Sequence, residues 1–166
     1  MRVLVAAASR YGATEEIADA LGRVLDEPGV DVDVVAIEEA TELSKYDAFV
    51  LGSGVYAGHW LKPARQFVDD HVDEIVARPT WLFSSGPIGD PPKPDADHAV
   101  DVDELVSKTR ARGHRVFAGK LDKNGMRFAD RAIVSAVRSA EGDFRDWGEI
   151  EAWGRQIGQA LKADEA

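Results

Sequence analysis

Short apolar runs alternate with amphipathic helical patterns along most of the chain. Most of the apolar runs are continuous, as expected for strands that are buried on both faces of a sheet. The second run alternates Asp with Val, which is typical of a half-exposed strand. The five predicted strands span residues 2–7, 31–37, 48–52, 81–84 and 115–119.

Apolar residues at helical spacing fill the gaps between these runs. The first helix carries Ile17, Leu21 and Leu25 on one face and ends before Pro28. The other main helices are predicted over residues 61–76, 103–111 and 147–161. Regular alternation of strands and helices predicts an α/β fold in three layers, with a doubly wound, five-stranded parallel sheet.

Length and composition narrow the function classes. With 166 residues the chain is expected to form a single domain over residues 1–166, with an extra amphipathic segment at about 120–141. The absence of cysteine excludes disulfides, thiolate catalysis and iron–sulfur ligation, so any electron chemistry needs a bound cofactor. A net charge of −10 argues against nucleic acid as the main partner.

The residue pattern also gives expectations for the protein's location in the cell and for metal binding. No apolar run approaches the length of a membrane span, and no signal peptide is evident, so a cytoplasmic protein is expected. The four histidines are scattered without metal-ligand spacing, and no metal site is predicted.

The loop after the first predicted strand is suited to a phosphate. A strand, a short turn with hydroxyls and a glycine, and then a helix place free backbone N–H groups and the positive end of the helix dipole at one point. Ser9 and Thr14 supply hydroxyls, and Gly12 allows a sharp turn. Helix capping by the two hydroxyls is the alternative. Glu15 and Glu16 suit the dipole but would repel a phosphate unless they point away.

Two further loops are expected at the same edge of the sheet, because ligands bind outside the carboxyl ends of parallel strands. The first of them contains three glycines together with Tyr56 and Trp60, and the second is rich in small residues. Together they suit a ligand with a phosphate at one end and a planar ring at the other. Tyr56 is alternatively a core aromatic, and Trp60 is expected to pack rather than to stack on a ligand.

A basic segment interrupts the acidic background. Residues 108–138 contain nine Lys or Arg and two Asp, a local charge of +7. Within it an apolar stripe lies beside Arg127, Arg131 and Arg138. A solvated helix face is one interpretation, and contact with an anionic substrate or membrane surface is the other.

The motifs resemble those of flavodoxin-type FMN proteins. Residues 9–14 (SRYGAT) have the hydroxyl and glycine positions of that family's phosphate loop, although Tyr11 replaces the usual Thr or Ser. The likeness is closer to the subgroup of flavodoxin-domain proteins that includes bacterial menaquinone-dependent protoporphyrinogen oxidase. It rests on GSGVYAGHWLKPA at residues 52–64, GKL at 119–121, the basic segment at 126–138 and GDFRDW at 142–147.

This resemblance implies a flavodoxin-like fold with strand order 2-1-3-4-5 and FMN as cofactor. The phosphate is expected on Ser9, Arg10, Tyr11, Gly12, Ala13 and Thr14. One side of the isoalloxazine is expected on Ser53, Gly54, Val55, Tyr56, Ala57 and Gly58, and the ring edge on Ser85, Gly86, Pro87, Ile88 and Gly89. No catalytic side chain is predicted, because the flavin carries the chemistry.

The implied reaction is oxidation of protoporphyrinogen IX with menaquinone as acceptor, with possible peripheral contact at the inner face of the membrane. Three alternatives remain: a flavodoxin-type electron carrier, an NAD(P)H-dependent FMN quinone or nitro-compound reductase, and a flavinless interaction domain. The basic segment argues against a simple carrier, and the intact first loop argues against a flavinless domain.

Overall fold

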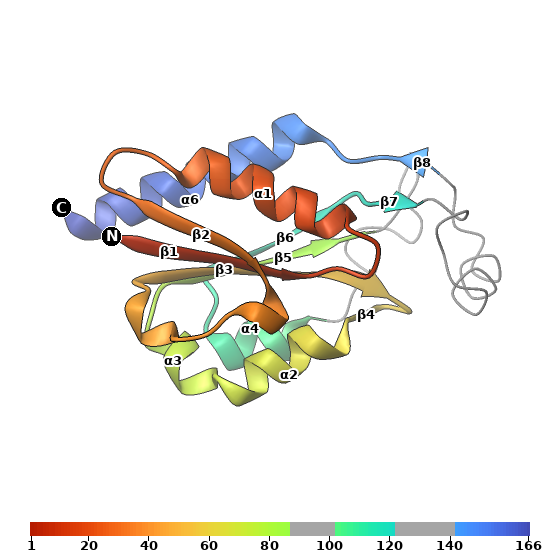
Figure 1. Cartoon of the computed structure of the whole chain (residues 1–166), viewed down its shortest axis with the longest axis horizontal. Coiled ribbons are helices and arrows are strands. Elements are labelled where there is room, and N and C mark those ends of the chain that lie inside the picture. The colour runs from red at the N-terminus through yellow and green to blue at the C-terminus, as the bar shows by residue number, and fades with distance from the viewer. Residues whose placement is uncertain (87–101, 122–141) are drawn as a thin grey trace.

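A parallel β-sheet forms the centre of the protein in the computed structural model, which describes residues 1–86, 102–121 and 142–166 (Figure 1). Its strands are β1 (Arg2–Ala8), β2 (Asp31–Ala36), β3 (Ala48–Tyr56), β5 (Thr80–Ser85) and β6 (Gly113–Phe117). They are all parallel and follow the order β2-β1-β3-β5-β6. This is the order 2-1-3-4-5 expected from the sequence, so the predicted fold class is confirmed.

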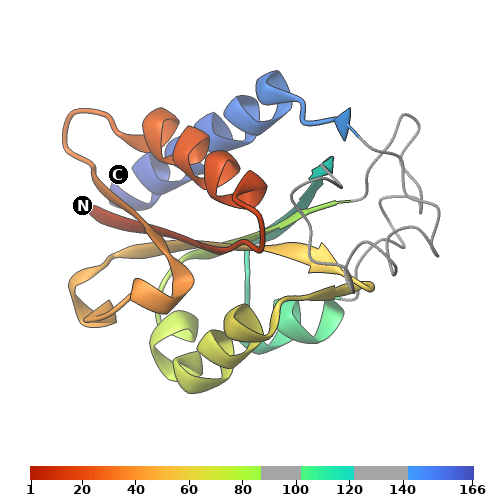
Figure 2. The ribbon, with the colours of Figure 1, turned by 45° about the vertical axis from the view of Figure 1, so that its right-hand side comes forward.

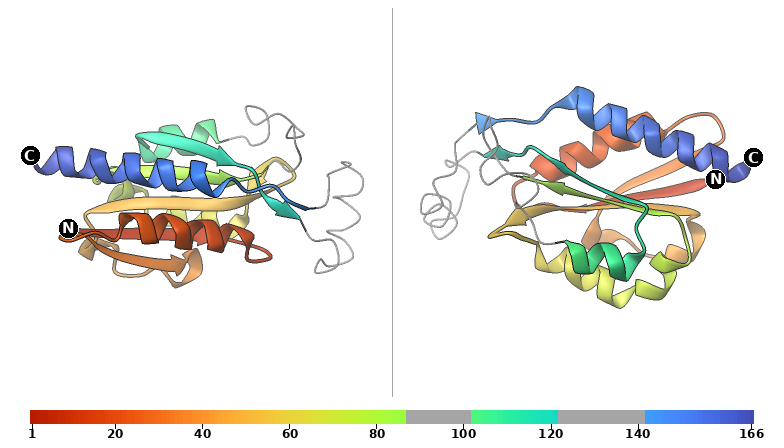
Figure 3. Two further views of the ribbon diagram at one scale, coloured as in Figure 1. Left: turned by 90° about the horizontal axis from the view of Figure 1, so that it is seen from above. Right: turned by 180° about the vertical axis from the view of Figure 1, so that it is seen from behind.

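Helices cover both faces of the sheet, giving three layers (Figures 1 and 2). One face is covered by α1 (Ala13–Leu25) and α6 (Trp147–Glu165), which lie side by side (Figure 3). The other face is covered by α2 (Lys62–Asp70), α3 (Val72–Val76) and α4 (Asp103–Thr109). Two short 3-10 helices, η1 (Ile37–Glu39) and η2 (Leu43–Lys45), connect β2 to β3.

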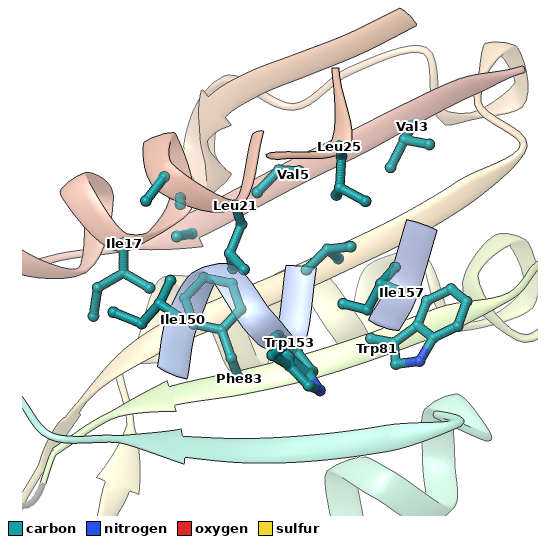
Figure 4. Packing of buried hydrophobic residues seen from close by; sticks show 14 of the residues in the cluster. Val3, Val5, Ile17, Leu21, Leu25, Trp81, Phe83, Ile150, Trp153 and Ile157 are labelled. Carbon is teal, nitrogen blue, oxygen red and sulfur yellow. The ribbon is translucent and has the colours of Figure 1, made fainter. Parts of the chain in front are cut away.

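Two hydrophobic cores flank the sheet. In the core under α1 and α6, Trp153 packs edge-on against Phe83, with ring centroids 6.3 Å apart (Figure 4). It packs in the same way against Phe117, with centroids 5.6 Å apart. Close approach depends on small residues: a Cβ built at Gly22 would lie 2.3 Å from Cγ2 of Val34. The α1 helix therefore packs directly on the sheet at Gly22.

The prediction of one long helix over residues 61–76 was wrong, because two helices occupy this stretch. The backbone leaves helical geometry at His71 (φ −124°, ψ 21°), so α2 and α3 are separate. The His71 ring packs against Phe67 with centroids 4.7 Å apart. Asp69 and Asp70 place negative charge at the end of α2, where the helix dipole disfavours it.

Three short strands were not anticipated. β4 (His59–Trp60) pairs antiparallel with the end of β3. β7 (Lys120–Leu121) and β8 (Gly142–Asp143) form a separate antiparallel ribbon. The predicted amphipathic segment between them, residues 122–141, lies outside the described residues. Among the described helices, none has both the length and the apolarity to cross a membrane.

Candidate functional site

The carboxyl ends of β1, β3 and β5 bring the predicted loops to one edge of the sheet. Ala8 at the end of β1 is opposite Ser53 of β3, and Gly54 is opposite Ser85 of β5. Ser85 in turn is opposite Phe117, the last residue of β6. The ends of these strands therefore lie next to one another, on the side of the molecule away from both termini (Figure 1).

The first loop turns on Gly12, whose φ of +90° is a conformation that favours glycine. The Gly12 N–H donates a 2.9 Å hydrogen bond to the Ser9 hydroxyl, which closes the turn. No side chain caps the start of α1. The alternative in which Ser9 and Thr14 serve as helix caps is therefore not what is seen, and the first-turn N–H groups of α1 face the loop.

Thr14 is buried at the point where the first two loops meet. The residue is only 4% exposed, and its hydroxyl forms no hydrogen bond with the described residues. Every fully buried polar side-chain atom in the described part of the chain has a partner, so this oxygen reaches the loop surface. A Cβ built at Gly54 would lie 3.2 Å from it. The absence of a side chain at Gly54 thus leaves room for a hydroxyl with free bonding capacity.

The second loop is mostly strand. β3 continues through Gly54 to Tyr56, and a two-residue turn at Ala57 (φ 51°) and Gly58 (φ 80°) leads into β4. Two positive φ values are typical of a type I′ hairpin turn. The sequence prediction treated this stretch as a loop because of its glycines.

Ser53 is committed to the fold by its side chain. Its hydroxyl donates to the Gly54 carbonyl at 2.8 Å and accepts from the Leu61 N–H at 3.0 Å, and the residue is fully buried. This ties β3 to the start of α2. Only the backbone of Ser53 remains for a ligand.

Arg10 and Tyr56 join the first loop to the second. The Arg10 guanidinium carbon lies 4.4 Å from the centroid of the Tyr56 ring, a cation–π contact. Tyr56 is half-buried at the end of β3, so it is not a core aromatic of the kind considered as the alternative. Tyr11, next to Arg10, is 44% exposed.

The third loop begins at the predicted place. Ser85 is 8% exposed, and Gly86 has a φ of +127° with its N–H donating to the Phe117 carbonyl at 2.7 Å. The remaining predicted residues of this loop, Pro87, Ile88 and Gly89, lie outside the described residues. So do the predicted anion contacts Arg127, Arg131 and Arg138.

A buried hydrogen-bond chain supports this edge from below. The Trp60 indole N–H donates to the Ser84 hydroxyl at 2.8 Å, and Ser84 lies 2.8 Å from Nε2 of His114. The direction of the bond between Ser84 and His114 depends on the tautomer of the imidazole ring. Burial lowers the pKa of His114. Trp60 is 2% exposed, so it packs rather than stacks on a ligand, as predicted.

The sequence analysis missed Arg145, which precedes α6. Its guanidinium bonds to Asp143 at 2.9 and 2.8 Å, to Glu16 at 2.9 Å and to the Ala13 carbonyl at 3.3 Å. It lies 4.6 Å from the centroid of Trp147. Two sequence signals pointed to it: the GDFRDW motif at residues 142–147 contains this arginine, and the charge of Glu16 beside a phosphate loop needs a compensating cation.

Titration around Arg145 follows from these contacts. The hydrogen bonds from Arg145 hold the pKa of Asp143 below its ordinary value.

In the described ranges, no group of three or more His, Asp or Glu residues could hold a metal ion.

Comparison with known proteins decides the family. The family model described as Flavodoxin domain matches residues 4–147. This chain belongs to the flavodoxin-domain family. Within the family, the chain is 25% identical over 171 residues to the Protoporphyrinogen IX dehydrogenase [quinone] of Escherichia coli strain K12, covering 95% of this chain and 94% of that protein. The relationship is therefore distant but full-length.

Solved flavodoxins share the fold of this flavodoxin-domain protein. Oxidised Flavodoxin 1 from Bacillus cereus aligns with a TM-score of 0.63 and 17% identity, covering 96% of this chain and 98% of that one. A flavodoxin from the domain Archaea aligns with a TM-score of 0.61 and 19% identity, covering 98% and 99%. At these identities the likeness concerns the fold alone.

Proposed function

We propose that this flavodoxin-domain protein binds FMN, with the phosphate in the loop of residues 9–14, and works as an FMN-dependent oxidoreductase. The observation that carries the proposal is the hydroxyl of Thr14, a residue only 4% exposed, which has no partner among the described residues and lies beside the uncapped start of α1. A phosphate dianion would receive the hydroxyl and the first-turn N–H groups, and the helix dipole would favour its charge.

The rest of the edge suits the flavin ring. The half-buried Tyr56 lies beside the loop with the exposed Arg10 over its ring, and there is open space where a Cβ would lie at Gly12 and at Gly58. Bound FMN would supply transfer of electrons between a reduced donor and an acceptor. The protein's part is to hold the phosphate, to orient the ring along residues 53–58 and 85–89, and to shape access to it.

We further propose protoporphyrinogen IX as electron donor and a quinone as acceptor. The support is the full-length likeness to the Escherichia coli dehydrogenase at 25% identity. An electron carrier is the second candidate, because known flavodoxins overlay nearly the entire chain.

Cofactor binding is tested by titrating the purified protein with FMN and with riboflavin, which lacks the phosphate. Loss of one charge-assisted hydrogen bond in Thr14→Val should weaken FMN by about 10- to 150-fold, equivalent to about 1.5–3 kcal/mol, and leave riboflavin nearly unchanged. The matched control is Thr109→Val, because the Thr109 hydroxyl donates to Leu105 within its own helix, away from the site. An equal loss of affinity for FMN and for riboflavin would show that this loop does not bind the phosphate.

The reaction is tested anaerobically with the FMN-loaded protein. Protoporphyrinogen IX and a menaquinone analogue are supplied together, each is omitted in turn, and NADPH replaces the porphyrinogen in a parallel assay. Porphyrin formation that requires the quinone supports the dehydrogenase. Turnover with NADPH alone supports a quinone reductase, and turnover in neither assay, with reversible reduction of the flavin, supports an electron carrier.

A further inference from the structure

Arg145 connects three parts of the chain that are distant in sequence. It follows β8, faces the first turn of α1 and precedes α6, and its side chain is only 4% exposed. Its fork is divided between partners: one side binds Asp143, while Nη1 reaches both Glu16 and the Ala13 carbonyl. The ring of Trp147 lies beside it.

A cation in this place needs an explanation. The N-terminus of a helix carries positive partial charge, so an arginine there is unfavourable unless anions surround it. Asp143 and Glu16 supply two carboxylates. Glu16 itself lies in the first turn of the helix that would receive the phosphate, where a free carboxylate would oppose a dianion.

We propose that Arg145 is a positioning residue that makes the loop of residues 9–14 selective for a phosphorylated flavin over an unphosphorylated one. It neutralises Glu16, holds that side chain in one place, and anchors the first turn of α1 through the Ala13 carbonyl. The inference rests on the proposed FMN function. It requires no contact between Arg145 and the phosphate.

Because the Arg145 side chain is buried, its charge acts over a longer distance than a solvent-exposed charge would. A guanidinium that is 4% exposed is poorly screened by salt, unlike a surface cation. The geometry also favours arginine over lysine for the anchoring: three partners lie in different directions around one planar fork, whereas a lysine ammonium is a single point charge. Lysine at this position would preserve the neutralisation and weaken the anchoring.

The test compares Kd for FMN and for riboflavin in the wild type, Arg145→Met, Glu16→Gln and the double variant. Arg145→Met removes one poorly screened positive charge beside the first turn of α1, so it should raise the Kd of FMN by about tenfold or more and leave that of riboflavin nearly unchanged. Glu16→Gln alone should lower the Kd of FMN, because it leaves Arg145 less neutralised. The double variant should recover most of the loss.

Controls separate position from stability. Arg112→Met removes an arginine that also binds a carboxylate, Asp164, and lies over a tryptophan, Trp81, but at the opposite end of the sheet. It should leave both flavin affinities unchanged. Arg145→Lys should retain most of the preference for FMN and lower the melting temperature.

The outcomes are distinguishable. If wild-type protein does not prefer FMN to riboflavin, the proposed function fails. If the wild type prefers FMN but Arg145→Met weakens both flavins equally, Arg145 is only structural and the inference is overturned. Should Arg145→Met not fold, Glu16→Gln decides: an unchanged ratio of the two Kd values overturns the inference, and a ratio shifted toward FMN supports it.

Discussion

Two glycines of β3, two residues apart on one face of the strand, should respond to alanine in opposite ways. A Cβ at Gly54 would lie 3.2 Å from the Thr14 hydroxyl and 3.9 Å from the Ala8 carbonyl. The Thr14 oxygen would have to move by a few tenths of an ångström. A Cβ at Gly52 would instead lie 2.2–2.4 Å from three ring atoms of Phe83, which is fully buried in the core shown in Figure 4.

The magnitudes differ accordingly. Gly54 has no left-handed backbone angle, so alanine there costs no backbone strain and should stabilise the fold by about 0.4–1 kcal/mol through the unfolded chain, offsetting the crowding. Its effect should fall on binding: a displaced hydroxyl loses part of a hydrogen bond that is worth about 1.5–3 kcal/mol, which corresponds to an FMN Kd raised about 5- to 20-fold. Gly52→Ala overpacks the core and should cost about 3 kcal/mol of stability or prevent folding.

Chemical denaturation and flavin titration measure the two effects separately. Gly54→Ala should keep its denaturation midpoint and its affinity for riboflavin while losing affinity for FMN. A Gly54→Ala protein that binds FMN as tightly as wild type would show that the Thr14 hydroxyl is not a ligand. A Gly52→Ala protein with wild-type stability would show that the packing of Phe83 against β3 is wrong.

Three other side chains give further tests. Tyr56→Ala should shift the absorption spectrum and midpoint potential of bound FMN with little loss of melting temperature; an unshifted spectrum with a large drop in melting temperature would show that Tyr56 supports the fold and does not contact the flavin. The buried His114 has a lowered pKa, so the unfolded chain binds the proton more readily, and stability should fall as pH drops from about 6.5 through the folded pKa. His114→Gln should flatten that dependence in thermal melts between pH 7 and 5. Burial and the hydrogen bond to Asp33 raise the pKa of Tyr46 to about 12, so an ultraviolet titration should lose a component near that pH in Tyr46→Phe.

The sheet was predictable because its strands carry strong local signals. Continuous apolar runs marked β1, β3 and β5, and the alternation of Asp and Val marked β2 at the edge. Their order came from family likeness, since no local pattern encodes which strand pairs with which. The sequence prediction failed where local preference and tertiary packing disagree. The glycines in β3 suggested a loop, although they allow close packing against Phe83 and Thr14.

Part of the candidate site was likewise predictable from local sequence, and part was not. The phosphate loop was identifiable because strand, turn and helix are contiguous in sequence. The role of Arg145 was not, since it meets Glu16 only after the chain has folded, 129 positions apart. The ribbon of β7 and β8 was missed because two-residue strands carry no periodic signal.

The division of the core between the two faces also bears on the order of folding during synthesis. Every buried residue of the core under α2 to α4 lies between Leu4 and Leu105. The opposite core includes four residues of α6: Ile150, Trp153, Ile157 and Leu161. On a ribosome, one face of the sheet has all its described packing partners before α6, which covers the other face, has been made. The α1 face of the nascent chain, which also carries the start of the phosphate loop, should therefore stay open to chaperones and proteases until α6 has left the ribosome.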